Sequence, residues 1–129
     1  MDAVAAGLIA AAASFLLNKA MIRMFGNIAL TTVIPIFEEG FKSLIPVLMG
    51  TSILLSHITF GIAESVYEVF TSSGKRAGLG AMVSFLSHCF LGILTVILIN
   101  TTKSLMLSII GAAFLHILWN RMVAGVYTR

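Results

Sequence analysis

Two adjacent glutamates and a lysine, Glu38, Glu39 and Lys42, lie within an otherwise apolar stretch that extends from Asn27 to Gly50. On a helix Lys42 is i,i+4 from Glu38 and i,i+3 from Glu39, so it can pair with either carboxylate. The two glutamates point about 100° apart, so one can face a cavity while the other pairs with the lysine. Each charge costs about 2.5–3.5 kcal/mol at the centre of a membrane helix. We therefore expect these residues to serve a function; the alternative is an ion pair that only holds helices together.

Polar side chains recur at similar depth in three later apolar segments. Glu64 belongs to the first of them, His88 to the next, and His116 with Asn120 to the last. His116 and Asn120 are i,i+4 and therefore share one helix face. Four helices that direct polar groups inward at one depth predict a buried hydrophilic pocket.

The residue types in this pocket suit the activation of water. Glu38 or Glu39 can accept a proton from water while a histidine orients it. A second histidine, together with Asn120, can donate hydrogen bonds to a developing oxyanion. A zinc site is the alternative, because Zn²⁺ accepts nitrogen and oxygen ligands and polarises water, although the His-Glu-x-x-His motif is missing. The candidate zinc ligands are Glu39, Glu64, His88 and His116.

Three further groups have more ordinary interpretations. Glu68 lies near the end of its segment, where an interfacial charge explains it as well as a functional role does. His57 lies near the opposite end, and we interpret it as a structural or interfacial histidine. Cys89 is the only cysteine, which excludes an internal disulfide and a cysteine-based metal cluster, and we expect it to pack as a small apolar residue.

Composition predicts the elements that must position these groups. Of the 129 residues 59% are hydrophobic and 10% are charged, against about 25% charged in an ordinary soluble domain. With a mean hydropathy of +1.06, the chain is predicted to be an all-α integral membrane protein. At about 20 residues per crossing, one compact domain over residues 1–129 has room for about five transmembrane helices. The expected spans are residues 3–21, 27–49, 52–70, 77–99 and 104–123.

Two local signals refine this bundle. Pro35 removes a backbone hydrogen bond just before the glutamates, so we expect the second span to bend or break there. Gly61 predicts the close approach of a neighbouring helix, and it leaves self-association into a homo-oligomer open.

The charged residues predict orientation and partners. The net charge of +3 does not suggest nucleic-acid binding, because the basic residues lie at helix ends, where membrane lipid head groups explain them. The chain begins Met1-Asp2 without a basic region, so no signal peptide is evident. The ends opposite the basic clusters carry only Asp2 and Lys103, so the N-terminus is expected outside and the C-terminus in the cytoplasm of a multi-pass protein of the cell membrane. The basic clusters are Lys19 with Arg23, Lys75 with Arg76, and Arg121 with Arg129.

Four of these motifs resemble one group of enzymes. Residues 38–42, Glu-Glu-Gly-Phe-Lys, are similar to the Glu-Glu-x-x-Lys motif of PrsW-type intramembrane proteases. Residues 60–65, Phe-Gly-Ile-Ala-Glu-Ser, resemble their Phe-Gly-x-x-Glu-Asn element, with serine in place of the asparagine. His88 and His116 fall where that group carries single histidines on two later helices. His116 and Asn120 also match a His-x-x-x-Asn element of the wider superfamily, which includes the CPBP/Abi proteins and the CAAX-processing endopeptidases.

The resemblance covers residues 35–121 and implies a membrane-embedded endopeptidase of the glutamate type. Its substrate would be a peptide bond in a membrane-associated protein or peptide, hydrolysed with or without a metal. The resemblance assigns water activation to Glu38 or Glu39 with His88 or Glu64, and oxyanion stabilisation to His116 and Asn120.

Two other classes of function remain open. The protein could be a non-catalytic membrane scaffold or immunity-type protein, in which the polar groups hold helices together and bind a partner. It could also be an ion or proton carrier that uses the chain of glutamates and histidines. The lack of a detectable inverted repeat in the sequence makes the carrier the least favoured of the three.

Overall fold

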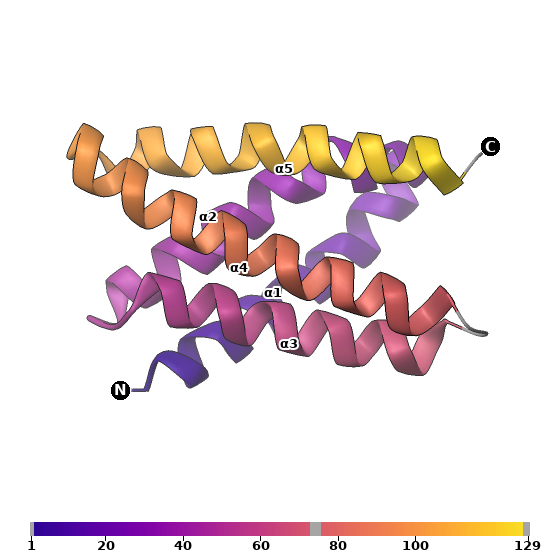
Figure 1. The fold of residues 1–129 in the computed structure, drawn as a ribbon, viewed down its shortest axis with the longest axis horizontal. Helices are drawn as coiled ribbons and strands as arrows, with labels where there is room; N and C mark the ends of the chain where they lie inside the picture. Colours follow the sequence, from indigo (N-terminus) through magenta and orange to yellow (C-terminus); the bar gives the residue numbers. More distant parts are fainter. Residues whose placement is uncertain (1, 73–75, 128–129) are drawn as a thin grey trace.

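The computed structural model describes residues 2–72 and 76–127, and these residues form only helices (Figure 1). Successive long helices run in opposite directions, so α1 begins and α5 ends at opposite ends of the bundle. The all-α fold with five α-helices is therefore confirmed. The elements are α1 (Ala3–Phe25), the 3-10 helix η1 (Gly26–Thr31), α2 (Val33–Leu48), α3 (Ile53–Thr71), α4 (Arg76–Thr102) and α5 (Leu105–Tyr127).

The surface of the bundle is apolar, and its interior combines mostly small apolar side chains with buried polar and charged ones. Large apolar side chains face outward along every long helix, and Leu48 and Phe70 are 85% and 84% exposed. A soluble monomer does not expose so continuous an apolar surface. The chain is therefore a multi-pass membrane protein. Four segments are long and apolar enough to cross a bilayer: Ala3–Thr31, Ile53–Thr71, Ala77–Thr102 and Leu105–Gly125.

The second predicted span, residues 27–49, is shorter than expected. Gly26–Thr31 forms η1, and α2 has only 16 residues from Val33 onward. At 1.5 Å per residue α2 is about 24 Å long, whereas the hydrocarbon core of a bilayer measures about 30 Å. The expected break at Pro35 is wrong: the helical path is interrupted at Thr32, and Pro35 lies in the first turn of α2, where a backbone N–H has no partner to lose.

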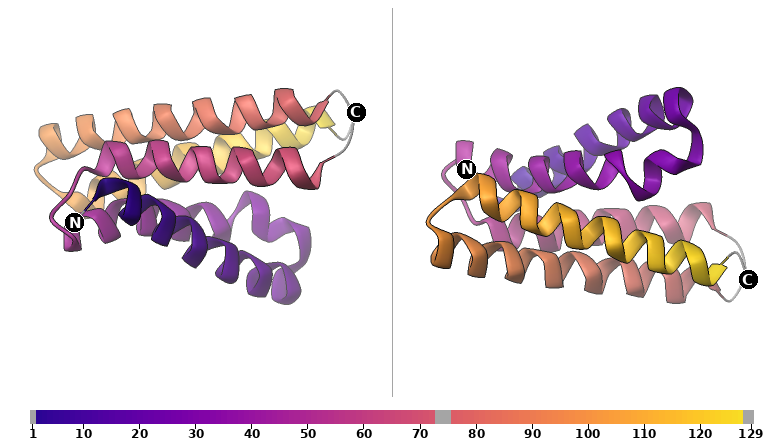
Figure 2. Two further views of the ribbon diagram at one scale, coloured as in Figure 1. Left: turned by 90° about the horizontal axis from the view of Figure 1, so that it is seen from below. Right: turned by 90° about the horizontal axis from the view of Figure 1, so that it is seen from above.

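The helices form two groups that diverge toward one end. α3, α4 and α5 stay together along their length, whereas α1, η1 and the start of α2 lean away toward the end of the bundle where α5 finishes (Figure 2). Two glycines allow close contacts between helices, one within the α3–α5 group and one between α1 and α3. A Cβ on Gly61 would lie 2.9 Å from the Cβ of His88, so the predicted close approach at Gly61 is confirmed. A Cβ on Gly7 would lie 2.6 Å from the Cβ of Thr59, which places α1 directly against α3.

The basic residues that predicted the orientation fall at the expected ends of their helices. Lys19 and Arg23 lie in the last turns of α1, and Arg121 lies in the last turns of α5, so these residues mark the same end of the bundle. Lys75 and Arg129, which also entered that prediction, lie outside the described residues.

Candidate functional site

The middle of the bundle contains a buried cluster of ionisable side chains. Glu39 and Lys42 have no exposed surface, and Glu38, His88 and His116 are at most 3% exposed. These residues come from α2, α4 and α5, and Glu64 on α3 joins them. His116 lies eleven residues from each end of α5, which is about 16 Å along the helix axis. The structure therefore brings the predicted carboxylates and histidines together at mid-membrane depth.

Lys42 is the centre of the cluster. Its Nζ lies 2.5 Å from Glu39 Oε1 and donates to His88 Nδ1 at 2.9 Å. The ammonium also lies 4.6 Å from the centre of the Phe60 ring, a distance that allows a cation–π contact. A buried charge is stable only when it is paired and hydrogen-bonded, and Lys42 meets this condition through partners on two helices.

His88 links Lys42 to the carboxylate of Glu64. Its Nε2 donates a hydrogen bond to Glu64 Oε2, and Ser84 Oγ donates to the same oxygen at 2.8 Å. A neutral ring with its proton on Nε2 satisfies both neighbours, because Nδ1 is then free to accept from Lys42. The Glu64 side chain is 38% exposed, so the series of contacts that begins at Lys42 reaches the surface of the bundle at Glu64.

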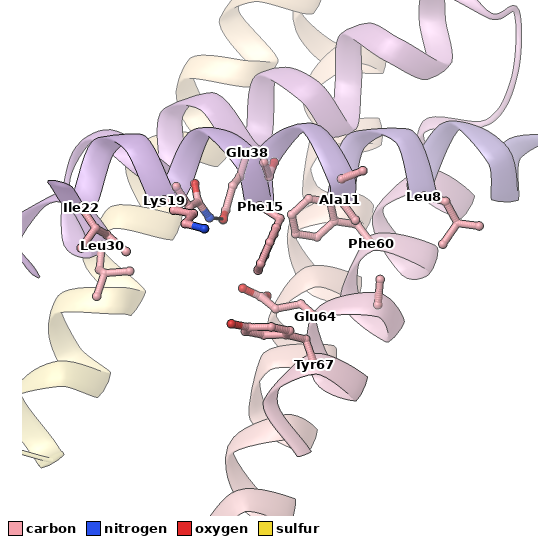
Figure 3. Close-up of a pocket in the computed structure, with 14 residues that line it drawn as sticks. Leu8, Ala11, Phe15, Lys19, Ile22, Leu30, Glu38, Phe60, Glu64 and Tyr67 are labelled. Atoms are coloured by element: carbon pink, nitrogen blue, oxygen red, sulfur yellow. Dashed lines mark hydrogen bonds between the residues drawn. The ribbon is translucent and has the colours of Figure 1, made fainter. Parts of the chain in front are cut away.

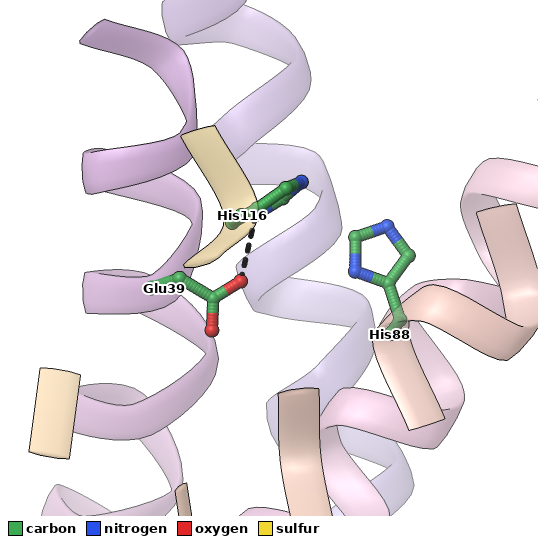
Figure 4. A group of neighbouring side chains, drawn as sticks. All are labelled: Glu39, His88 and His116. Carbon is green, nitrogen blue, oxygen red and sulfur yellow. Dashed lines mark hydrogen bonds and ion pairs between the residues drawn. The ribbon is translucent and has the colours of Figure 1, made fainter. Parts of the chain in front are cut away.

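His116 joins the two adjacent glutamates. Its Nδ1 donates to Glu39 Oε1 at 2.9 Å, and its Nε2 lies 3.9 Å from Glu38 Oε2. Figure 4 shows the ring of His116 above the Glu39 carboxylate, with His88 across from both. The two imidazole rings meet edge to face with their centres 5.4 Å apart. The contacts therefore run from Glu64 through His88, Lys42, Glu39 and His116 to Glu38.

Glu38 and Glu64 both border open space, and Glu39 does not. A cavity of about 770 Å³ lies between α1 and α3, and a second of about 490 Å³ lies between η1, α4 and α5. The carboxyl groups of Glu38 and Glu64 line both cavities, as does Asn18, whose Nδ2 donates to Glu38 Oε1 at 2.9 Å. Glu39 and Lys42 line neither of these two cavities. Glu38 is therefore the member of the adjacent pair that a bound molecule can reach.

The larger cavity is apolar at both ends and polar in between. On the side of α1, Leu8 and Ala11 line one end, and Ile22 with Leu30 of η1 lines the other (Figure 3). Lys19 and Glu38 lie between these apolar ends. Phe15 of α1 projects toward Tyr67 of α3, and the two rings meet edge to face with centres 5.3 Å apart. This shape suits an elongated, mainly apolar ligand with one polar group beside the carboxylates.

Three residues near the cluster were not expected there from the sequence. Of the two interpretations of His57, structural or interfacial, the interfacial one is excluded, because its side chain is fully buried. Its Nδ1 lies 3.9 Å from Glu39 Oε2, and neither atom has a hydrogen-bond partner among the described residues. Its position seven residues before Glu64, on the same face of α3, was the signal that could have put it in the cluster. Asn18 and Ser84 carried no such signal, because single polar residues in apolar helices are common.

Asn120 and Glu68 lie at the edge of the site. The Asn120 amide donates to the carbonyl of Leu30 at 3.0 Å, so it ties α5 to η1. Both residues line the smaller cavity, and both are half-buried. Asn120 therefore shapes the cavity wall and uses one of its two amide N–H donors to hold η1.

Three of the four predicted zinc ligands are arranged as a potential metal site. Glu39, His88 and His116 each offer a ligand atom, and these atoms lie within 4.8 Å of one another. The fourth, Glu64, contacts His88 Nε2, as the outer partner of a metal-bound histidine commonly does. However, the Lys42 ammonium contacts both Glu39 Oε1 and His88 Nδ1. The residues present therefore do not fit a metal ion while Lys42 keeps this position.

The fold and the site define a multi-pass helical membrane protein with a buried cluster of glutamate, histidine and lysine side chains beside two cavities. Comparison of the chain with protein-family models, with curated proteins and with solved structures finds no match. The function is therefore argued from the geometry of the cluster.

Proposed function

We propose that the protein is a membrane-embedded endopeptidase that hydrolyses a peptide bond of a membrane-associated protein or peptide without a metal. One observation carries this proposal: Glu38 and Glu64 both line the polar middle of a largely apolar cavity, with His116 beside Glu38 and His88 beside Glu64. Hydrolysis needs a base for water within reach of the scissile carbonyl, and a carboxylate at the wall of a cavity can serve as that base. The resemblance of the motifs to PrsW-type proteases points to the same chemistry.

Glu38 is the proposed general base. Its carboxylate accepts a proton from water as the water oxygen attacks the carbonyl carbon of the substrate, which gives a tetrahedral intermediate. The intermediate collapses when the bond from carbon to nitrogen breaks and the leaving amine takes the proton held by Glu38. Asn18 orients the Glu38 carboxylate through its hydrogen bond to Oε1. Glu64 lines the same cavity, and its Oε1 can accept a second hydrogen bond from the attacking water, since Ser84 and His88 both contact Oε2.

The residues behind the two carboxylates set their positions. His116 faces Glu38 with Nε2 and is held by Glu39 through Nδ1. When Nε2 carries a proton, the ring can donate to the oxyanion, and the Glu39 carboxylate stabilises the resulting imidazolium. His88, on α4, orients the Glu64 carboxylate through the hydrogen bond from its Nε2. Lys42 neutralises Glu39 and connects the two histidine–carboxylate pairs.

The substrate is proposed to enter from the lipid. The larger cavity lies between α1 and α3, and its walls are mostly apolar from Leu8 to Tyr67. An extended peptide segment can lie there with its carbonyl beside Glu38. The proposed location is the cell membrane, with the N-terminus outside and the C-terminus in the cytoplasm, because Lys19, Arg23 and Arg121 mark one end of the bundle.

The test is reconstitution of the purified protein in liposomes with a set of labelled single-span peptides. We expect cleavage products whose mass shows the addition of one water, and we expect the products to disappear for Glu38→Gln. Product formation by the Glu38→Gln variant at the wild-type rate would overturn the assignment of the base.

A non-catalytic scaffold is the second candidate, and the complete burial of the Glu39–Lys42 ion pair favours it. Both side chains are fully buried and face neither cavity, as expected of groups that only join helices. A scaffold predicts that substitution of Glu38 weakens partner capture without changing any turnover. The same liposome assay, combined with affinity capture from membranes, separates the two functions.

A further inference from the structure

The position of the Lys42 ammonium resembles that of a bound cation. It is fully buried and lies between Glu39 Oε1 on α2 and His88 Nδ1 on α4. Glu39 and His88, together with His116, offer ligand atoms that lie within 4.8 Å of one another. Ligands of one zinc ion lie about 2.0–2.2 Å from the metal and so at most about 4.4 Å apart. A small inward movement of these side chains would therefore complete three ligands.

We infer that Lys42 is the resident cation of this site: its ammonium takes the place of a divalent transition metal, and removal of the lysine unmasks a metal site at Glu39, His88 and His116. A metal and the ammonium cannot share the position, because two positive charges would then face each other in a fully buried site, where their repulsion is poorly screened. The inference does not depend on the proposed protease activity, since it concerns cation binding alone.

The surroundings of the histidines support this inference. Glu64 and Ser84 fix the ring of His88 from its far side, and such outer contacts orient metal-binding histidines in general. Glu39 Oε2 and His57 Nδ1 are fully buried without a hydrogen-bond partner among the described residues. Glu39 therefore has a spare oxygen, and His57 has a spare ring nitrogen 3.9 Å from it. The cluster holds more donor atoms than the single ammonium uses.

Cobalt binding to purified protein in detergent tests the inference. The wild type and Lys42→Met are stripped with a chelator, mixed with Co²⁺ and desalted, and bound metal is measured by elemental analysis and by visible absorption. We expect one Co²⁺ per chain in Lys42→Met, with the strong visible bands of a four-coordinate site, and none in the wild type. Lys42→Arg keeps the positive charge and is expected to bind none. Stoichiometric Co²⁺ in the wild type that is lost in His116→Ala would overturn the inference.

Two further variants identify the ligands. His116→Ala in the Lys42→Met background is expected to abolish the visible bands. Glu64→Gln in the same background is expected to weaken Co²⁺ binding by about 10- to 100-fold, as the loss of an outer partner of a metal-bound histidine does. Unchanged affinity in both double variants would place the metal elsewhere and overturn the proposed ligand set.

Loss of Lys42 also leaves Glu39 without its counter-charge, so Lys42→Met is expected to be less stable than the wild type. Thermal unfolding with and without Co²⁺ then shows whether the metal binds, even when the variant is less stable than the wild type. We expect Co²⁺ to raise the unfolding temperature of Lys42→Met and of Lys42→Gln and to leave that of the wild type unchanged. The absence of a rise in both variants would contradict the inference.

Discussion

Glu38 and Glu39 are adjacent in the sequence but have different surroundings in the bundle. Glu38 lines both cavities and accepts a hydrogen bond from Asn18. Glu39 is enclosed between Lys42 and His116 and reaches neither cavity. The helical angle of about 100° between neighbouring residues is sufficient for this separation. One carboxylate is therefore available for chemistry, and the other holds the cluster together.

Conservative substitution of each glutamate should separate these roles. Glu38→Gln keeps an oxygen for the Asn18 amide, so we expect normal folding and a fall in turnover of about 10²- to 10⁴-fold. Glu39→Gln leaves the Lys42 charge buried without its partner, and we expect a loss of about 3–5 kcal/mol of stability. Peptide cleavage in liposomes and thermal unfolding in detergent measure the two effects. The reverse pattern, with an unstable Glu38 variant and an inactive but stable Glu39 variant, would exchange the roles.

Alanine at Gly61 should disturb the position of His88. The added Cβ would lie 2.9 Å from the Cβ of His88, so α3 and α4 must separate. Overpacking of this kind costs about 1–3 kcal/mol, and we expect turnover to fall with it because His88 moves away from Glu64. Thermal unfolding and peptide cleavage measure both quantities.

Gly40→Ala is the matched control for that substitution. Gly40 follows the glutamates directly, but a Cβ there would meet no atom within 4 Å. Alanine is a better helix former than glycine by roughly 1 kcal/mol, so we expect equal or slightly higher stability. If both alanine variants behaved alike, the close contact at Gly61 would have no special importance.

A reversible bridge between α1 and α3 should block entry to the larger cavity. The rings of Phe15 and Tyr67 touch across it, so cysteines at these positions can be joined by a short, reducible bis-maleimide in a Cys89→Ser background. We expect cleavage of the labelled peptide to stop after cross-linking and to return after reduction. Each single-cysteine variant treated with the same reagent is the control. Full activity of the cross-linked protein would show that the substrate uses another route.

Reporter fusions should reveal the orientation of the bundle. Lys19, Arg23 and Arg121 lie toward one end, and this end is expected in the cytoplasm. A reporter that functions only in the cytoplasm should therefore be active after Tyr127 and inactive before Ala3. The complementary reporter, active only outside, should give the opposite pattern. Two reporters that agree on the opposite orientation would contradict the prediction.

The four long spans followed directly from hydropathy, because a bilayer core demands about 20 apolar residues per helix. Hydropathy did not predict where α2 begins. Residues 27–31 are mostly apolar and suit an α-helix as well as the 3-10 helix that they form. The one local signal is Gly26, whose φ of 66° ends α1 in a conformation that other residues avoid.

The cluster was partly predictable for a similar reason. Buried charges in apolar helices are expensive and must find one another, so Glu64, His88 and His116 were expected to meet Glu38 and Glu39. Which glutamate faces the cavity depends on how α2 is rotated against its neighbours, and hydropathy does not encode that rotation. The central position of Lys42 depends on the same rotation, because Lys42 contacts His88, which lies 46 residues further along the sequence on another helix.

The shortness of α2 makes the thickness of the bilayer relevant to this site. Glu38 lies only five residues after Val33, where α2 begins, which is about 7.5 Å along the axis. A helix about 6 Å shorter than the hydrocarbon core draws head groups inward at η1 or forces the helices to tilt. Water therefore has a shorter path to Glu38 from this end than the long helices would allow. Lipids with longer chains should lengthen that path, so hydrophobic mismatch is a natural means of controlling how well the site is hydrated.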